Sequence, residues 1–186
     1  MKTKDCLIAA LAPVPVLLIP LVGVMVSEDW KWSFFDFVAA WFILALTTFL
    51  CRLLVTRRPT NLAYRLGAIL AVAAGFLITW ISLAVQIIGD ENPANVLYLA
   101  VIVTGLAGVG LARFQAVGMA RAAFATAVVT FLVPVVGVIL WPADFSPGVW
   151  QVFMLNSVFV LMFAAAGLLF RHAGGQAGDS VAATPA

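Results

Sequence analysis

The stretch IIGDENPANVLY, residues 87–98, decides how the rest of the chain is interpreted. Two acidic residues, Asp90 and Glu91, precede Asn92, Pro93 and Asn95, and long apolar runs lie on both sides of this polar group. A capping residue and a proline between two apolar runs are typical of the turn of a helical hairpin. The same oxygen-bearing side chains could instead bind a hard cation. The other turns of the chain bear on which interpretation is favoured.

Composition identifies the class of protein. The chain has 186 residues, of which 65% are hydrophobic and only 10% charged, whereas a soluble domain carries roughly 25% charged residues. Several apolar runs reach the roughly 20 residues that a helix needs to cross about 30 Å of hydrocarbon. We therefore expect an integral membrane protein in contact with the lipid bilayer. Its few, dispersed basic residues give no reason to expect nucleic acid as a partner.

Apolar runs alternate with polar breaks along the chain, and this alternation predicts an all-α, polytopic transmembrane helical bundle of six spans in three hairpins. A spanning chain must satisfy its backbone internally, and these runs lack the alternation of barrel strands. The spans are predicted at residues 6–26, 34–55, 66–88, 95–112, 121–141 and 149–170. Together they form a single transmembrane domain over residues 1–170, and residues 171–186 are predicted to be a disordered cytoplasmic tail.

The first apolar run follows a basic N-terminus, as it would in a secretory signal peptide. It extends over about 21 residues, longer than the usual apolar segment of such a peptide, and no A-x-A cleavage site follows it. These features favour a span that is retained in the protein. Prolines at positions 13, 15 and 20 predict a bent first helix, which could act as a gate or simply conform to its neighbours.

Basic residues gather on one side of the six predicted spans. If the N-terminus is cytoplasmic, nine of the ten fall on the inner side: Lys2, Lys4, Arg52, Arg57, Arg58, Arg65, Arg113, Arg121 and Arg171. Lysine and arginine in short loops favour the cytoplasmic side, so we expect the N-terminus and the C-terminus to be cytoplasmic. Cys6 and Cys51 would then face a reducing compartment as free thiols.

Acidic residues gather on the opposite side, in the predicted outer turns. Six of them lie there: Glu28, Asp29, Asp36, Asp90, Glu91 and Asp144. Each outer turn also carries a helix-start signal, which is Ser33 with Asp36 at capping-box spacing, Asn92 before Pro93, and Ser146 before Pro147. Three capped turns explain the acids without a ligand. The alternative is an acidic rim, in which the six carboxylates converge on Ca²⁺ or Mg²⁺, although no calcium-loop spacing is present.

The predicted span interiors offer little chemistry. Ionisable residues, which would mark an ion or proton path, are missing from the predicted span centres. Gln86 and Asn156 are the polar residues most costly to bury, and they could read a substrate or join neighbouring helices. The single histidine, His172, lies at the end of the last span, and no triad or zinc set can be assembled around it. No catalytic residue, metal ligand or cofactor is therefore predicted.

Small residues recur at four-residue steps in the third to fifth spans. These seams comprise Gly67, Ala71 and Gly75, then Ala100, Thr104, Gly108 and Ala112, then Gly118, Ala122, Thr126 and Thr130. Small residues allow the backbones of membrane helices to approach closely. We therefore expect these three spans to form the tightly packed centre of the bundle.

Four segments carry a resemblance to a known group of proteins. They are LIPLVGVMVSEDWKWSFFDF (18–37), IIGDENPANVLY (87–98), ARFQAVGMARAAFATA (112–127) and LLFRH (168–172). They resemble a family of small, uncharacterised bacterial multi-pass inner-membrane proteins. The resemblance implies the bacterial cytoplasmic membrane as location, and it supplies no site residue.

These observations favour a non-catalytic accessory or stress-related membrane component, with a membrane-protein partner or a second copy of itself as candidate partners. The alternative is a small-solute or ion transporter or channel that uses Gln86, Asn156 and the helix breaks. Such a transporter could act as an oligomer. An intramembrane enzyme ranks third, because no nucleophile–base pair or metal set can be assembled.

Overall fold

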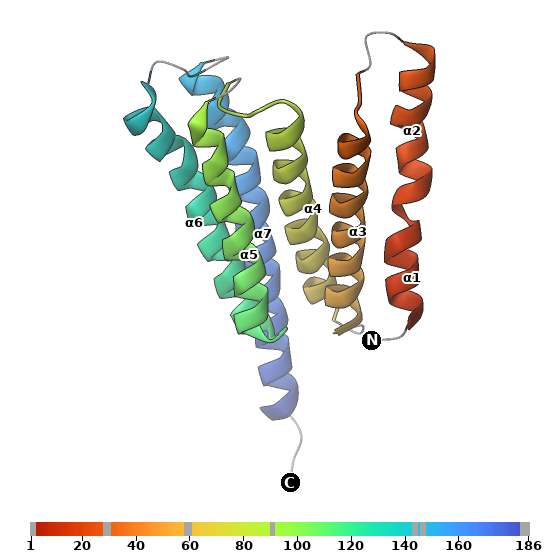
Figure 1. The fold of residues 1–186 in the computed structure, drawn as a ribbon. Helices are drawn as coiled ribbons and strands as arrows, with labels where there is room; N and C mark the ends of the chain where they lie inside the picture. Colours follow the sequence, from red (N-terminus) through yellow and green to blue (C-terminus); the bar gives the residue numbers. More distant parts are fainter. Residues whose placement is uncertain are drawn as a thin grey trace. The chain divides into compact units, whose positions relative to one another are not determined.

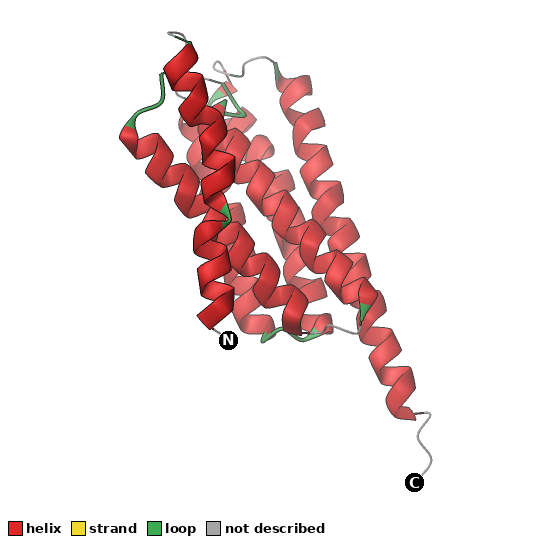
Figure 2. Ribbon diagram, turned by 90° about the vertical axis from the view of Figure 1, so that its right-hand side faces the viewer, coloured by secondary structure: helices red, strands yellow, loops and turns green. Residues whose placement is uncertain are grey.

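A computed structural model describes residues 3–27, 31–57, 61–89, 92–142, 145 and 148–182 (Figure 1). Every regular element in these ranges is a helix (Figure 2). The helices are α1 (Thr3–Leu11), α2 (Pro13–Val26), α3 (Phe34–Arg57), α4 (Leu62–Ala84), the 3-10 helix η1 (Pro93–Leu97), α5 (Tyr98–Ala112), α6 (Ala116–Leu140) and α7 (Val149–Ala182). The predicted all-α class is confirmed.

Six helical stretches of the described chain are long and apolar enough to cross a membrane. They are Leu7–Val26, Phe34–Thr56, Leu62–Ala84, Pro93–Ala112, Ala116–Leu140 and Val149–Gln176. Each coincides with one predicted span, and the largest differences are at both ends of the third span, at the start of the fifth and at the end of the sixth. The chain is therefore a multi-pass helical membrane protein in length and composition.

The chain divides into two compact units, Met1–Thr56 and Arg57–Ala186. In the first unit, the stretch that forms the first span is interrupted at Ala12, between α1 and α2. The interruption follows from Pro13 and Pro15, which have no N–H to donate to the preceding helical turn. The indole Nε1 of Trp41, in α3, donates a hydrogen bond of 3.1 Å to the carbonyl oxygen of Ala10. This bond holds α3 against the interrupted helix.

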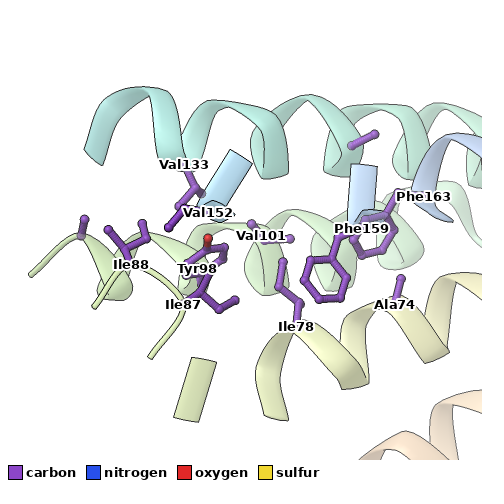
Figure 3. Close-up of a cluster of buried hydrophobic side chains, with 12 residues drawn as sticks. Ala74, Ile78, Ile87, Ile88, Tyr98, Val101, Val133, Val152, Phe159 and Phe163 are labelled. Carbon is purple, nitrogen blue, oxygen red and sulfur yellow. The ribbon is translucent and has the colours of Figure 1, made fainter. Parts of the chain in front are cut away.

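The second unit is a bundle built around α7. Helix α7 packs against α6 and α4, and α5 packs against α6, whereas α4 and α5 make few contacts with each other. The prediction that the third to fifth spans form the centre is therefore wrong. Three phenylalanines of α7 explain the difference, because Phe159, Phe163 and Phe170 are each at most 5% exposed and fill the interior. Figure 3 shows two of these rings within the apolar cluster of the bundle.

The predicted small-residue seams differ in what they face. A Cβ added at Gly108 would lie 2.6 Å from the Cβ of Ala122, so α5 and α6 do approach closely there. The seam of α4 faces α7 instead, since a Cβ at Gly67 would lie 3.2 Å from the carbonyl oxygen of Ala166. A Cβ added at Gly75 would have no atom of another described segment within 4 Å. Close packing is thus confirmed for α5 and α6 and is absent around Gly75.

Helix α7 continues past residue 170, where the sequence predicted a disordered tail from residue 171. Ala173 is buried, with 1% of its surface exposed. A Cβ added at Gly174 would lie 3.1 Å from a methyl group of Val117 in α6. The small residues that suggested disorder instead allow α7 to lie against the start of α6. The expectation is therefore wrong for residues 171–176.

Candidate functional site

The described part of the stretch 86–98 forms a turn that is held together by its own asparagines. The Asn95 Oδ1 accepts a bond of 3.1 Å from the backbone N–H of Ile88, and its Nδ2 donates to the carbonyl oxygens of Gly89 (2.9 Å) and Asn92 (3.1 Å). The Asn92 Oδ1 accepts from the N–H of Ala94 at 2.8 Å. Asn92 is thus the cap of η1, as predicted, and Pro93 begins that helix.

This turn packs into the interior of the bundle. Ile87, Ile88 and Ala94 are each at most 5% exposed and belong to the same apolar cluster as Val133 and Val152 (Figure 3). Gly89 adopts a φ of 102°, a conformation that glycine tolerates without strain. The turn therefore closes one end of the bundle with apolar side chains.

Asn156 of α7 is paired with Tyr98, the first residue of α5. The Tyr98 hydroxyl donates to Asn156 Oδ1 at 3.0 Å and accepts from Asn156 Nδ2 at 2.8 Å. The same Nδ2 donates to the carbonyl oxygen of Val152 at 2.9 Å. Asn156 is 1% exposed and Tyr98 is 3% exposed. Both polar groups are thus buried and satisfied by each other.

Sequence reasoning found Asn156 by the cost of burying an amide, but it missed Tyr98 as the partner. The available signal was position, since Tyr98 follows the capped Asn92–Pro93 turn and is one of only two tyrosines in the chain. Gln86, the other predicted polar candidate, is half-buried and has a φ of 54° at the start of the turn. The structure does not bring Gln86 together with Asn156 by any recorded bond.

Hydroxyl groups along the described spans bond mostly to their own helices. Each of the following donates to the carbonyl four residues earlier, at 2.7–2.9 Å: Thr47, Thr48, Thr79, Thr126, Thr130 and Ser157. Ser82 differs, because its Oγ is buried with no hydrogen-bond partner among the described residues. These six hydroxyl hydrogens are thus used within single helices and do not join one helix to another.

The predicted acidic rim is represented in the structure by Asp36 alone. Its Oδ2 accepts from the backbone N–H of Ser33 at 2.7 Å and from the Ser33 hydroxyl at 2.8 Å. The Ser33 Oγ accepts in return from the N–H of Asp36 at 3.3 Å. This is the reciprocal geometry of a capping box, as the spacing predicted.

The other five acids of the predicted rim lie outside the described residues, and they are Glu28, Asp29, Asp90, Glu91 and Asp144. Whether they converge is therefore still a prediction. Within the described ranges, no three residues among His, Cys, Asp and Glu come together as a metal site would require.

The second tyrosine closes the opposite end of the bundle. The Tyr64 hydroxyl donates to the carbonyl oxygen of Phe114 at 3.1 Å, and its ring lies edge-on against Phe170 at 5.1 Å. Arg113 and Phe114 have φ values of 46° and 63°, which give a short left-handed turn between α5 and α6. The two tyrosines thus perform matching roles at the two ends.

A chain of amides also ties α7 to the start of α4. Asn61 caps α4 by accepting from the N–H of Tyr64 at 2.9 Å, and its Nδ2 donates to Gln176 Oε1 at 3.3 Å. The Gln176 Nε2 lies 3.1 Å from His172 Nε2. An amide nitrogen can only donate, so the His172 Nε2 accepts this bond. His172 therefore holds the Gln176 amide that bonds to Asn61.

Apart from the Ser82 hydroxyl, the buried polar side chains described above bond to one another or to backbone groups, and this arrangement stabilises helix packing. No family model matches the chain, and searches of curated proteins and of solved structures also return no match.

Proposed function

We propose that the chain is a non-catalytic accessory or stress-related component of a bacterial cytoplasmic membrane. It acts through the outer surfaces of its helices on another membrane protein or on a second copy of itself. Both termini lie in the cytoplasm in this proposal, as the distribution of basic residues favours.

One observation carries the proposal, and it is the closed bonding of Asn156 with Tyr98. A residue that reads a solute must keep a donor or acceptor available, but the Asn156 amide already bonds to Tyr98 and to the carbonyl of Val152. The turn at residues 86–98 also covers this end of the bundle with apolar side chains. These contacts support a role in packing over a role in transport.

The proposal is tested by removing both polar groups at once, in the double variant Tyr98→Phe with Asn156→Leu. In a strain that lacks the protein, this variant is expected to reach the wild-type level in the membrane and to restore growth under membrane stress as the wild type does. Replacing both partners of a buried hydrogen bond by apolar groups costs little stability. Ser157→Ala, a neighbouring change on α7, is the control and should also restore growth.

A transporter that reads its solute through Asn156 would behave differently. The double variant would then accumulate normally and melt normally, yet fail to restore growth. That combination of results would contradict the accessory role and support the transporter.

A further inference from the structure

Four arginines lie near one end of the four-span unit, the end where α4 and α6 begin. They are Arg65 in α4, Arg113 after α5, Arg121 in α6 and Arg171 in α7, and all four are exposed. We call these four residues the arginine belt. Each comes from a different span, so all four helices of the unit contribute to the belt.

Three of the four arginines lie at the same level along the bundle. Contacts between α4 and α7 place Gly67 beside Phe170 and Asn61 beside Gln176, and this antiparallel register puts Arg65 level with residues 171–172. Contacts between α6 and α7 place Val117 beside Gly174 and Phe124 beside Gly167.

This register of α6 against α7 puts Arg171 level with residues 120–121, which include Arg121. On α5, Ala112 lies beside Gly118, so Arg113 is level with residue 117, about 6 Å nearer the end of the bundle at 1.5 Å per residue.

The position of the belt relative to the helix ends indicates which layer of the membrane the arginines contact. Arg121 is five residues after the start of α6, and Arg171 directly follows the apolar run that ends at Phe170. Five helical residues correspond to about 7 Å. The headgroup region adds roughly 5–8 Å to each side of the hydrocarbon core. The belt therefore lies on the flanks of the helices, at the depth of lipid headgroups, where a soluble partner would have little access.

The charge at this end of the bundle also favours the phosphate of a lipid headgroup as the ligand. By sequence, the acids of this unit are Asp90, Glu91, Asp144 and Asp179, and the first three belong to the turns at the opposite end. The belt end is therefore strongly basic. Guanidinium groups bind phosphate through two parallel hydrogen bonds, which an ammonium group cannot reproduce.

We propose that the arginine belt binds the phosphate groups of anionic phospholipids, of the phosphatidylglycerol class, and so fixes the depth of the bundle in one leaflet. This binding is independent of whether the protein is an accessory component or a transporter.

The test uses the full chain in lipid nanodiscs of phosphatidylcholine, with or without phosphatidylglycerol. We expect phosphatidylglycerol to raise the melting temperature by a few degrees, because it binds the folded state. In the triple variant Arg65→Gln, Arg121→Gln and Arg171→Gln, we expect affinity for this lipid to fall by about 100-fold at low salt, at roughly fivefold for each basic residue. Lys31→Gln removes a single charge outside the belt, and it should keep the full rise in melting temperature on adding phosphatidylglycerol. The triple Arg→Lys variant should keep part of that rise.

Native mass spectrometry gives a second reading that does not require the triple variant to fold. Wild-type protein released from the mixed nanodiscs should carry more phosphatidylglycerol than phosphatidylcholine, and Arg121→Gln alone should carry less of it. The proposal is overturned if the Gln variants retain the wild-type lipid count or melting shift. It is also overturned if inorganic phosphate, compared with chloride at equal ionic strength, produces the same shift, since that would indicate a site for free anions.

Discussion

The Asn156 amide destabilises the bundle only if one of its hydrogen bonds is left unmade. In the wild type, Tyr98 supplies both a donor and an acceptor, and the carbonyl of Val152 takes the remaining amide hydrogen. Burial of these groups is therefore compatible with stability, even though a buried polar group without a partner costs several kcal/mol in hydrocarbon. The pair joins α5 to α7 inside the bundle.

Single and double variants of this pair should differ in stability. We expect Asn156→Leu alone to lower the free energy of unfolding by about 1–2 kcal/mol, because the Tyr98 hydroxyl is left buried without its partner. Adding Tyr98→Phe should recover part of this loss. Reversible unfolding in mixed micelles measures both values. Equal losses for the single and the double variant would show that the pair is not coupled.

At the scale of the helices, packing depends on which small residues meet a neighbour. Gly108 of α5 faces Ala122 of α6 so closely that a methyl group would collide with it, whereas Gly75 of α4 faces open space. The four-residue periodicity of small residues is the same in both helices. The periodicity therefore indicates where close packing is possible, and the partner helix determines where it occurs.

Gly108→Ala and Gly75→Ala form a matched pair that tests this difference. We expect Gly108→Ala to destabilise the protein by about 1–3 kcal/mol, because the α5–α6 contact must open to admit the methyl group. Gly75→Ala should be neutral or stabilising by up to about 1 kcal/mol, because alanine favours the helix more than glycine does. Melting temperatures of the two purified variants decide the matter. Equal decreases in the melting temperature of both variants would contradict the close contact between α5 and α6.

The same elements show what the sequence can and cannot predict. Span positions were predicted within a few residues, because hydropathy and the caps at Ser33 and Asn92 are local properties. The central place of α7 was not predicted, because the composition of the six apolar helices does not distinguish which of them lies at the centre. Tyr98 was missed for a similar reason, since its partner lies 58 residues away. The Gly- and Ala-rich segment after residue 170 was misread because small residues favour both disorder and close packing.

At the scale of the whole molecule, a two-span unit precedes a four-span unit in one chain. Both the accessory role and the arginine belt require that these helices cross a membrane with the belt on a defined side. Lysine and arginine favour the cytoplasmic side, and the exposed arginines of α4, α6 and α7 share one level of the bundle. The orientation is therefore the central claim on which both proposals depend.

Cysteine labelling tests that claim most directly. In a background with Cys6→Ser and Cys51→Ser, a single cysteine is introduced either as Glu91→Cys or as Gln115→Cys, so that α5 lies between the two positions. Gln115 is exposed, in the turn beside the belt. We expect a membrane-impermeant maleimide to label position 91 in intact spheroplasts and position 115 only after the membrane is permeabilised. Labelling of position 115 but not 91 would reverse the orientation, and labelling of both before permeabilisation would contradict a membrane-spanning α5.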